Sequence, residues 1–218
     1  MTSSAKNMDG GTGRSNSHGN EAPLSKKIAN HAIMTALMVV MTLLAFPVPP
    51  PIQFIGFAPI LVYLVGIMLK PLRAFSISAV GSVLGQACYD LITGNTDPLT
   101  MLVYATGAFV ARGLGAFIIS LLETSIVRKR NIKRIHSIPV ELLILIVGAI
   151  WEYIGYSLVG APYWISLTPG LTVGAVFIGY LYVLFDLVFV PVGFAVVEGV
   201  RRGLDVQYLD AMMFSDYQ

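Results

Sequence analysis

Long apolar runs separated by short polar breaks dominate the chain from residue 28 onward. An α-helix rises about 1.5 Å per residue, so about 20 apolar residues suffice to cross the hydrocarbon core of a bilayer. Six runs approach or exceed this length, at residues 28–46, 54–69, 72–92, 99–127, 138–159 and 170–200. The pattern predicts an all-α membrane protein with six transmembrane helices.

The breaks between these runs contain residues that end helices. Four prolines fall within residues 47–51, and Pro71 directly follows Lys70 in the second break. Residues 94–98 read Gly-Asn-Thr-Asp-Pro, a sequence typical of a turn. Pro162 and residues 168–170 frame the fifth break, so we expect the fifth helix to end before Pro162.

Basic residues mark one side of the membrane in this arrangement. Of 14 lysines and arginines, all but Arg112 lie before the first run, in the second break or at the adjoining start of the third run, in the fourth break, or after the last run. Cytoplasmic loops of membrane proteins carry an excess of Lys and Arg. The distribution predicts a multi-pass protein of the cell membrane with both termini in the cytoplasm.

The ends of the chain have a different composition from its centre. Residues 1–24 are rich in Ser, Gly and Asn and have too little apolar surface to offset the entropy of ordering. We expect a disordered cytoplasmic tail at 1–24, a six-helix transmembrane domain at 25–203 and a short cytoplasmic tail at 204–218.

Composition supports this interpretation and narrows the function. Hydrophobic residues make up 56% of the chain and charged residues 12%, with a mean hydropathy of +0.75, whereas a soluble domain has about 25% charged residues. The sequence contains neither HExxH nor a phosphate-binding GxxxxGK[ST]. We therefore expect no catalytic residue, metal or cofactor, no nucleic-acid partner, and no hydrolysis of ATP by this chain.

Two ionisable residues fall near the middle of predicted helices, where charge is costly. Counted from the outer ends of their helices, Arg112 and Asp186 reach similar depths. The favoured interpretation is an ion pair between the fourth and sixth helices, because an unpaired charge there costs far more than a paired one. The alternative is that either residue contacts a polar group of a bound solute.

Glu152 lies in an aromatic stretch of the fifth helix, and no basic residue is expected at its depth. One interpretation is an aromatic belt at the membrane interface. The other is a pocket in which Glu152 binds a cation or a ring N–H while aromatic rings stack on a flat solute, such as thiamine or a relative. The predicted substrate-binding residues are Glu152, Trp151, Tyr153, Tyr156, Trp164, Gln86 and Asp90.

Small residues at four-residue spacing allow close approach of membrane helices. Gly81 and Gly85 have this spacing in the third predicted helix, and Ala32 and Ala36 have it in the first. We expect the glycines to serve packing within the chain.

The arrangement resembles the S component of energy-coupling factor (ECF) transporters. The features that carry the likeness are six helices in about 200 residues, the AxxxA of Ala32 and Ala36, the proline-rich first connection and a glycine-rich fourth helix. The turn at Lys70-Pro71 departs from a Gly-Pro-like turn of that family. The resemblance implies a subunit that captures a vitamin-like solute at the outer face and delivers it by toppling in the membrane. It also implies a transmembrane coupling protein, which Ala32 and Ala36 would contact, and two cytoplasmic ATPases.

Two other function classes remain open at this point. One is an intramembrane enzyme acting on a lipid or prenyl substrate, with Glu152 or Asp186 as acid or base. The other is a stand-alone secondary transporter, although no internal duplication is visible. The sequence identifies neither the solute nor whether the ATPases are dedicated to this subunit or shared.

Overall fold

A computed structural model describes residues 24–47, 54–94, 97–129 and 134–203. The predicted tails at 1–24 and 204–218 lie outside these residues, apart from Leu24, which begins the first helix. The prolines of the first connection at positions 49–51 also lie outside them.

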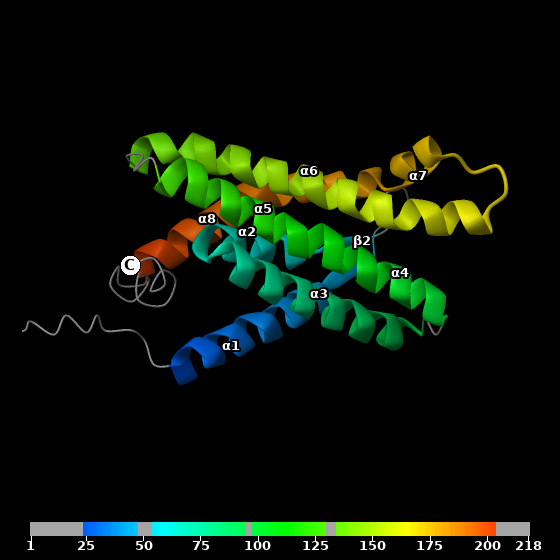
Figure 1. Cartoon of the computed structure of the whole chain (residues 1–218), viewed down its shortest axis with the longest axis horizontal. Coiled ribbons are helices and arrows are strands. Elements are labelled where there is room, and N and C mark those ends of the chain that lie inside the picture. Colours follow the sequence, from blue (N-terminus) through cyan, green and yellow to red (C-terminus); the bar gives the residue numbers. More distant parts are fainter. Residues whose placement is uncertain (1–23, 48–53, 95–96, 130–133, 204–218) are drawn as a thin grey trace, which may run out of the picture.

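Helices account for nearly all of the described chain, so the predicted all-α class is confirmed (Figure 1). Three segments stand alone, namely α1 (Leu24–Leu43), α2 (Ala58–Met68) and α3 (Pro71–Thr93). The fourth rod joins α4 (Pro98–Ala108), the π-helical η1 (Phe109–Gly113), α5 (Leu114–Leu122) and the π-helical η2 (Glu123–Arg128). The fifth is α6 (Arg134–Leu167), and the sixth joins α7 (Val173–Gly179), the 3₁₀-helical η3 (Leu181–Val188) and α8 (Phe189–Gly203).

Four helical stretches of the described residues are long and apolar enough to cross a membrane. They are Pro71–Thr93, Pro98–Arg128, Ser137–Leu167 and Val173–Gly203, which match the third to sixth predicted runs. The second run differs from its prediction, because α2 is only 11 residues long.

A short antiparallel hairpin replaces helix where the first two runs meet. Strand β1 (Ala45–Pro47) pairs with β2 (Phe54–Gly56), with Phe46 opposite Ile55. The predicted first helix therefore ends too late and the second begins too early. Strands of three residues give no measurable alternation of apolar and polar positions, so the pattern could not separate them from helix.

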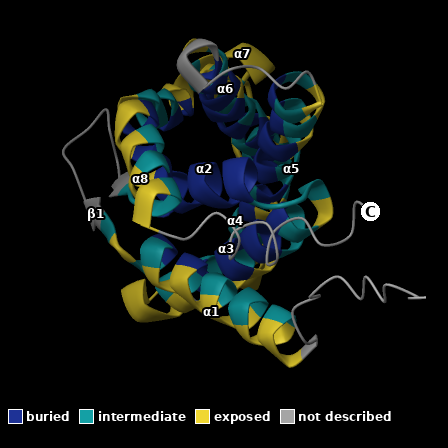
Figure 2. Ribbon diagram, turned by 90° about the vertical axis from the view of Figure 1, so that its left-hand side faces the viewer, coloured by how far each residue is buried: buried dark blue, intermediate teal, exposed yellow. Residues whose placement is uncertain are grey.

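Helix α2 forms the centre of the molecule, and all of its residues are buried (Figure 2). It packs mainly against α8, α5 and α3. Helix α1 lies at the periphery and packs mostly on α3. An added Cβ at Gly81 would lie 2.5 Å from the Met38 side chain, and one at Gly85 would lie 2.6 Å from Thr42. The predicted packing role of these glycines is confirmed.

The fifth helix is longer than the sequence pattern indicated. It continues through Pro162 to Leu167 and ends where Gly170 adopts the left-handed conformation, with φ of 87°. Prolines are tolerated inside membrane helices when neighbouring groups satisfy the freed backbone. The prediction that this helix ends before Pro162 is wrong, and the extension changes the depth of every residue counted from its outer end.

Candidate substrate-binding cavity

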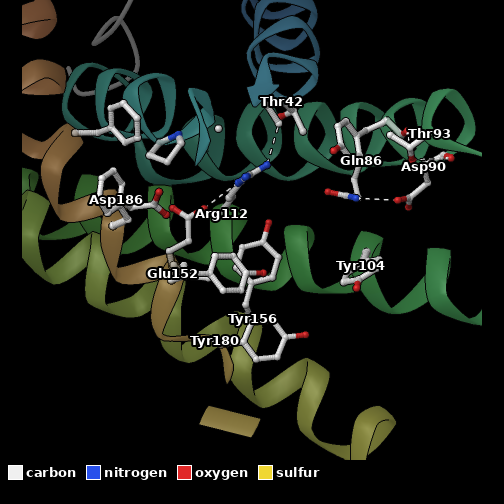
Figure 3. Close-up of a pocket in the computed structure, with 18 residues that line it drawn as sticks. Thr42, Gln86, Asp90, Thr93, Tyr104, Arg112, Glu152, Tyr156, Tyr180 and Asp186 are labelled. Carbon is white, nitrogen blue, oxygen red and sulfur yellow. Dashed lines mark hydrogen bonds and ion pairs between the residues drawn. The ribbon is translucent and has the colours of Figure 1, made fainter. Parts of the chain in front are cut away.

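A cavity of about 310 Å³ lies among the hairpin, the α1 and α3 C-terminal halves, η1, α6 and the η3 segment (Figure 3). This volume is within the range of small-molecule sites in proteins. The lining combines charged, amide, hydroxyl and aromatic side chains. It consists of Thr42, Ala45, Gly56, Pro59, Gln86, Tyr89, Asp90, Thr93, Tyr104, Arg112, Glu152, Tyr156, Tyr180, Tyr182, Val183, Phe185, Asp186 and Phe189.

The 3₁₀ geometry of η3 explains why so much of the lining comes from one segment. With three residues per turn, side chains three positions apart point the same way. Val183, Asp186 and Phe189 follow this spacing, and Tyr180 precedes them by one further step. All four line the cavity. An α-helix through the same residues would spread them around its circumference.

Arg112 reaches the cavity from the π-helical turn η1, and its polar contacts hold the guanidinium in place. Nε donates to Glu152 Oε1 at 2.8 Å, and Nη1 donates to Thr42 Oγ1 at 3.4 Å (Figure 3). The guanidinium also lies 5.8 Å from the centroid of the Tyr156 ring, a distance typical of a cation–π contact. Irregular π turns within helices are frequent at functional sites.

The pairing of Arg112 with Glu152 corrects two predictions. Arg112 lies 14 residues after the first residue of α4, and Glu152 lies 15 residues before the last residue of α6, so both reach the same depth. The expectation that no basic residue meets Glu152 rested on a fifth helix that ended too early. Arg112 consequently pairs with Glu152, and the predicted Arg112–Asp186 ion pair is not formed.

Asp186 occupies the cavity wall close to this pair (Figure 3). Its backbone carbonyl accepts a hydrogen bond of 3.2 Å from the Tyr63 hydroxyl, which fixes the position of the segment. Within the described residues its carboxylate makes no hydrogen bond or ion pair. The cavity therefore has one arginine facing two carboxylates, and one of these is available to a bound molecule.

A second polar group lies on α3 at the other end of the cavity (Figure 3). Gln86 Nε2 donates to Asp90 Oδ1 at 3.1 Å, and Asp90 is only 3% exposed. The amide and the carboxylate bind each other and both residues line the cavity, which supports their predicted place in the site.

The structure brings together four of the seven predicted substrate-binding residues. Glu152, Tyr156, Gln86 and Asp90 line the cavity, and Trp164 lines a neighbouring one. The other two are occupied in packing. Trp151 Nε1 donates to the Val110 carbonyl at 3.3 Å. Tyr153 donates to the Phe177 carbonyl at 3.0 Å and packs edge-on against the Phe177 ring.

Several lining residues were not predicted, above all Tyr104, Tyr180, Tyr182 and Thr42. Tyr180 and Tyr182 carry a signal in the sequence, because they lie 10 and 12 residues inside the sixth run, deeper than the interface at which tyrosine is enriched. Thr42 carries no such signal, because hydroxyl residues are common in membrane helices.

The model of the family described as ECF-type riboflavin transporter, S component, matches residues 24–197. The chain belongs to this S-component family. Its fold also resembles that of a solved structure described as FolT bound with folic acid, with a TM-score of 0.50 and 18% sequence identity. The similarity covers 83% of this chain and 95% of FolT. No curated protein matches the sequence significantly.

Membership of this family settles the class of function. S components are membrane-embedded transport subunits that bind vitamins, and they are not enzymes. The intramembrane-enzyme alternative is therefore wrong. The tyrosines and charged side chains around the cavity belong to a transport subunit of the vitamin-binding kind.

Proposed function

We propose that this S component captures riboflavin, or a close flavin relative, in the cavity around Arg112, Glu152 and Asp186. The observation that carries the proposal is the coincidence of a riboflavin-family match with a cavity of about 310 Å³ lined by tyrosines and by an arginine between two carboxylates. The likeness to FolT supports the fold and does not enter the choice of ligand.

The chemistry of riboflavin matches the lining. Its fused ring system is flat and uncharged, which suits stacking on tyrosine faces. Its ring carbonyls accept hydrogen bonds of the kind that Arg112 donates, whereas its ring N–H and ribityl hydroxyls donate to groups such as the Asp186 carboxylate. Riboflavin is thus a flat, nitrogen-containing, neutral solute. It matches the expected flat solute that stacks on aromatic rings better than thiamine does, because thiamine has two smaller separate rings.

Ligand binding by the purified protein tests this proposal. Native mass spectrometry identifies any vitamin that the protein retains, and quenching of flavin fluorescence measures riboflavin affinity. We expect riboflavin to bind stoichiometrically and more tightly than thiamine or folic acid. Tighter binding of either competitor, or no binding of riboflavin, would refute the assignment.

Transport also needs partners, and α1 offers the surface for them. Ala32 and Ala36 are both exposed on this peripheral helix, next to Ile33 at 63% exposure. Small exposed residues at this spacing let another membrane helix approach closely. We propose that a transmembrane coupling protein, itself joined to two cytoplasmic ATPases, contacts α1 at Ala32 and Ala36.

A bulky substitution on α1 distinguishes docking to the coupling protein from riboflavin binding. Ala32→Trp should abolish ATP-dependent uptake and co-purification with the coupling protein while riboflavin affinity stays within twofold. Leu143→Trp is the matched control, because Leu143 is 60% exposed on α6. Equal loss of uptake in both variants would contradict docking through α1.

We propose delivery by toppling, which the charge distribution supports. The proposed outer connections lack Lys and Arg, and carrying such a charge through hydrocarbon costs about 3 kcal/mol or more. Thr168→Arg, between α6 and α7, should therefore impair uptake more than riboflavin binding. Gly203→Arg at the basic end is the control, since an added Cβ there meets no atom within 4 Å. Equal loss of binding and uptake in Thr168→Arg would count against toppling.

The orientation itself is testable in intact cells. In a Cys88→Ala background, Thr168→Cys should react with a membrane-impermeant thiol reagent, whereas Lys129→Cys should react only after the membrane is opened. The reverse pattern would place the basic end outside.

A further inference from the structure

A second cavity, of about 240 Å³, adjoins the first between the C-terminal part of α6 and the α7–η3 segment. Three tyrosines line both cavities, namely Tyr104, Tyr180 and Tyr182, and we call this group the tyrosine partition. The remaining wall is aromatic and aliphatic, and includes Trp164, Leu171 and Val176.

The tyrosine partition is held in place by contacts on α6. Trp164 Nε1 donates to the Tyr180 hydroxyl at 3.1 Å. The Tyr180 ring lies so close to Gly160 that an added Cβ would come within 2.3 Å of the hydroxyl oxygen. Tyr180 also stacks on Tyr182, with ring centroids 6.1 Å apart and planes inclined by 28°. The partition therefore presents a fixed aromatic surface to both cavities.

The two cavities differ in chemistry. The first holds Arg112, Glu152, Asp186, Gln86 and Asp90, whereas the second has no ionisable group except the shared tyrosines among the described residues. Ala175 and Gly179, which line the second cavity, are exposed, so this cavity opens to the surface of the described chain. A space without charged side chains, beside aromatic and aliphatic groups, is suited to an apolar part of a ligand.

We propose that the two cavities form one elongated site, in which the second receives the apolar, methyl-bearing edge of a flavin ring. The inference rests on the proposed function and adds the direction of the ligand. The polar edge of the ring and the ribityl chain point toward Arg112, Glu152 and Asp186, and the ring lies against the tyrosine partition. Selectivity for the methylated edge is then set by α7 and the end of α6.

Filling the second cavity tests this arrangement. Ala175 lines it, and Ala175→Trp should weaken riboflavin binding at least tenfold. Ile178→Trp is the matched control on the same short helix, because Ile178 is 68% exposed and does not line either cavity. Gly179→Phe is a second filling variant, since an added Cβ meets no atom within 4 Å and the backbone is not left-handed.

A riboflavin analogue that lacks the two ring methyl groups gives an independent readout. It should bind the unsubstituted protein several-fold more weakly than riboflavin does, and this difference should disappear in Ala175→Trp. Riboflavin binding by the unsubstituted protein with unchanged affinity in both filling variants would overturn the elongated site and leave the proposed function standing. Failure of the unsubstituted protein to bind riboflavin would overturn both.

Discussion

Two buried charge clusters lie at different depths in the helix bundle, one near its middle and one near its basic end, and they use the same residue types in opposite ways. The cavity cluster consists of Arg112, Glu152 and Asp186. The basic-end cluster consists of Glu123 and Glu141 with Arg128 and Arg201. Glu152, Glu123 and Glu141 are all at most 2% exposed, so burial alone does not distinguish the two.

Pairing does distinguish them. In the basic-end cluster Arg201 binds Glu141 at 2.7 Å and Glu123 at 3.4 Å, and Arg128 lies 3.7 Å from Glu123. Arg128 also donates to the Ile67 carbonyl at the end of α2. These groups tie η2, α6, α8 and α2 together. The cavity cluster has one arginine for two carboxylates and faces open space. Matched charges around a closed contact indicate a structural role, and surplus charge facing a cavity indicates binding.

The largest effect is expected from removing the shared arginine of the basic-end cluster. Arg201→Met leaves Glu123 and Glu141 short of a partner and should destabilise the fold by about 3–5 kcal/mol, measured as the thermal unfolding midpoint in detergent. Riboflavin affinity of the folded fraction should not change. Arg202→Met is the control, because Arg202 is 79% exposed and its pair with Glu198 contributes about 1 kcal/mol at most. An unchanged unfolding midpoint in Arg201→Met would contradict the structural role of the basic-end cluster.

A smaller effect should follow from separating the helices that hold the cavity cluster. An added Cβ at Gly155 would lie 2.7 Å from the Ala111 Cα, so Gly155→Ala must push α6 away from η1. Overpacking of this kind costs about 1–3 kcal/mol, and it should weaken binding because it moves Glu152 away from Arg112. Gly174→Ala, where the nearest atom is Thr172 Oγ1 at 4.0 Å, should change neither the unfolding midpoint nor the affinity.

The contrast between the clusters is sharpest in a pair of conservative variants. Asp186→Asn should reduce riboflavin affinity about tenfold, which corresponds to about 1.4 kcal/mol, without lowering the unfolding midpoint. Glu141→Gln should do the reverse, lowering the midpoint and leaving the affinity unchanged. Calorimetric titration measures the riboflavin affinity of both variants, and thermal unfolding measures their midpoints. The same changes in both variants would contradict the distinction between a binding cluster and a structural cluster.

The smallest effect concerns an exposed carboxylate that belongs to neither cluster. Asp97 caps α4, and hydrogen bonds from the side chain and the backbone of Thr100 lower its pKa below the usual 3.8. A depressed pKa contributes stability above 3.8 that is lost as the pH falls through the folded-state value. Asp97→Ala should therefore lower the unfolding midpoint slightly near pH 7, and the difference should shrink below about pH 3.8. A difference independent of pH would show that the charge is irrelevant.

Much of the fold could be predicted because lipid imposes a strong constraint on sequence. Apolar runs of spanning length located the long helices, and Gly94 and Asp97 marked the turn before α4 correctly. The paired strands Ala45–Pro47 and Phe54–Gly56 were missed because three-residue strands have no periodic signal. The partner of Glu152 was missed because Pro162 was taken as a helix end, although in the structure it lies inside α6.

The candidate site was predicted less completely for a related reason. Counting residues from the helix ends identified Arg112, Glu152 and Asp186 as ionisable groups inside the membrane. The count could not show which of these side chains face one another. The π turn at η1 and the 3₁₀ segment η3 rotate their residues away from α-helical positions. Val183 and Asp186 enter the cavity together for this reason. Neither segment differs in composition from ordinary membrane helix.

Helix α2 is 11 residues long and rises about 16 Å, roughly half the hydrocarbon thickness. Its final turn is anchored by Arg128, and Pro59 in its first turn lines the cavity together with Gly56 of β2. The cavity therefore begins where this short central helix begins. Shortening or lengthening α2 by one turn would change the cavity volume while the surrounding helices stay in place. Such a change would let the same fold bind vitamins of different size.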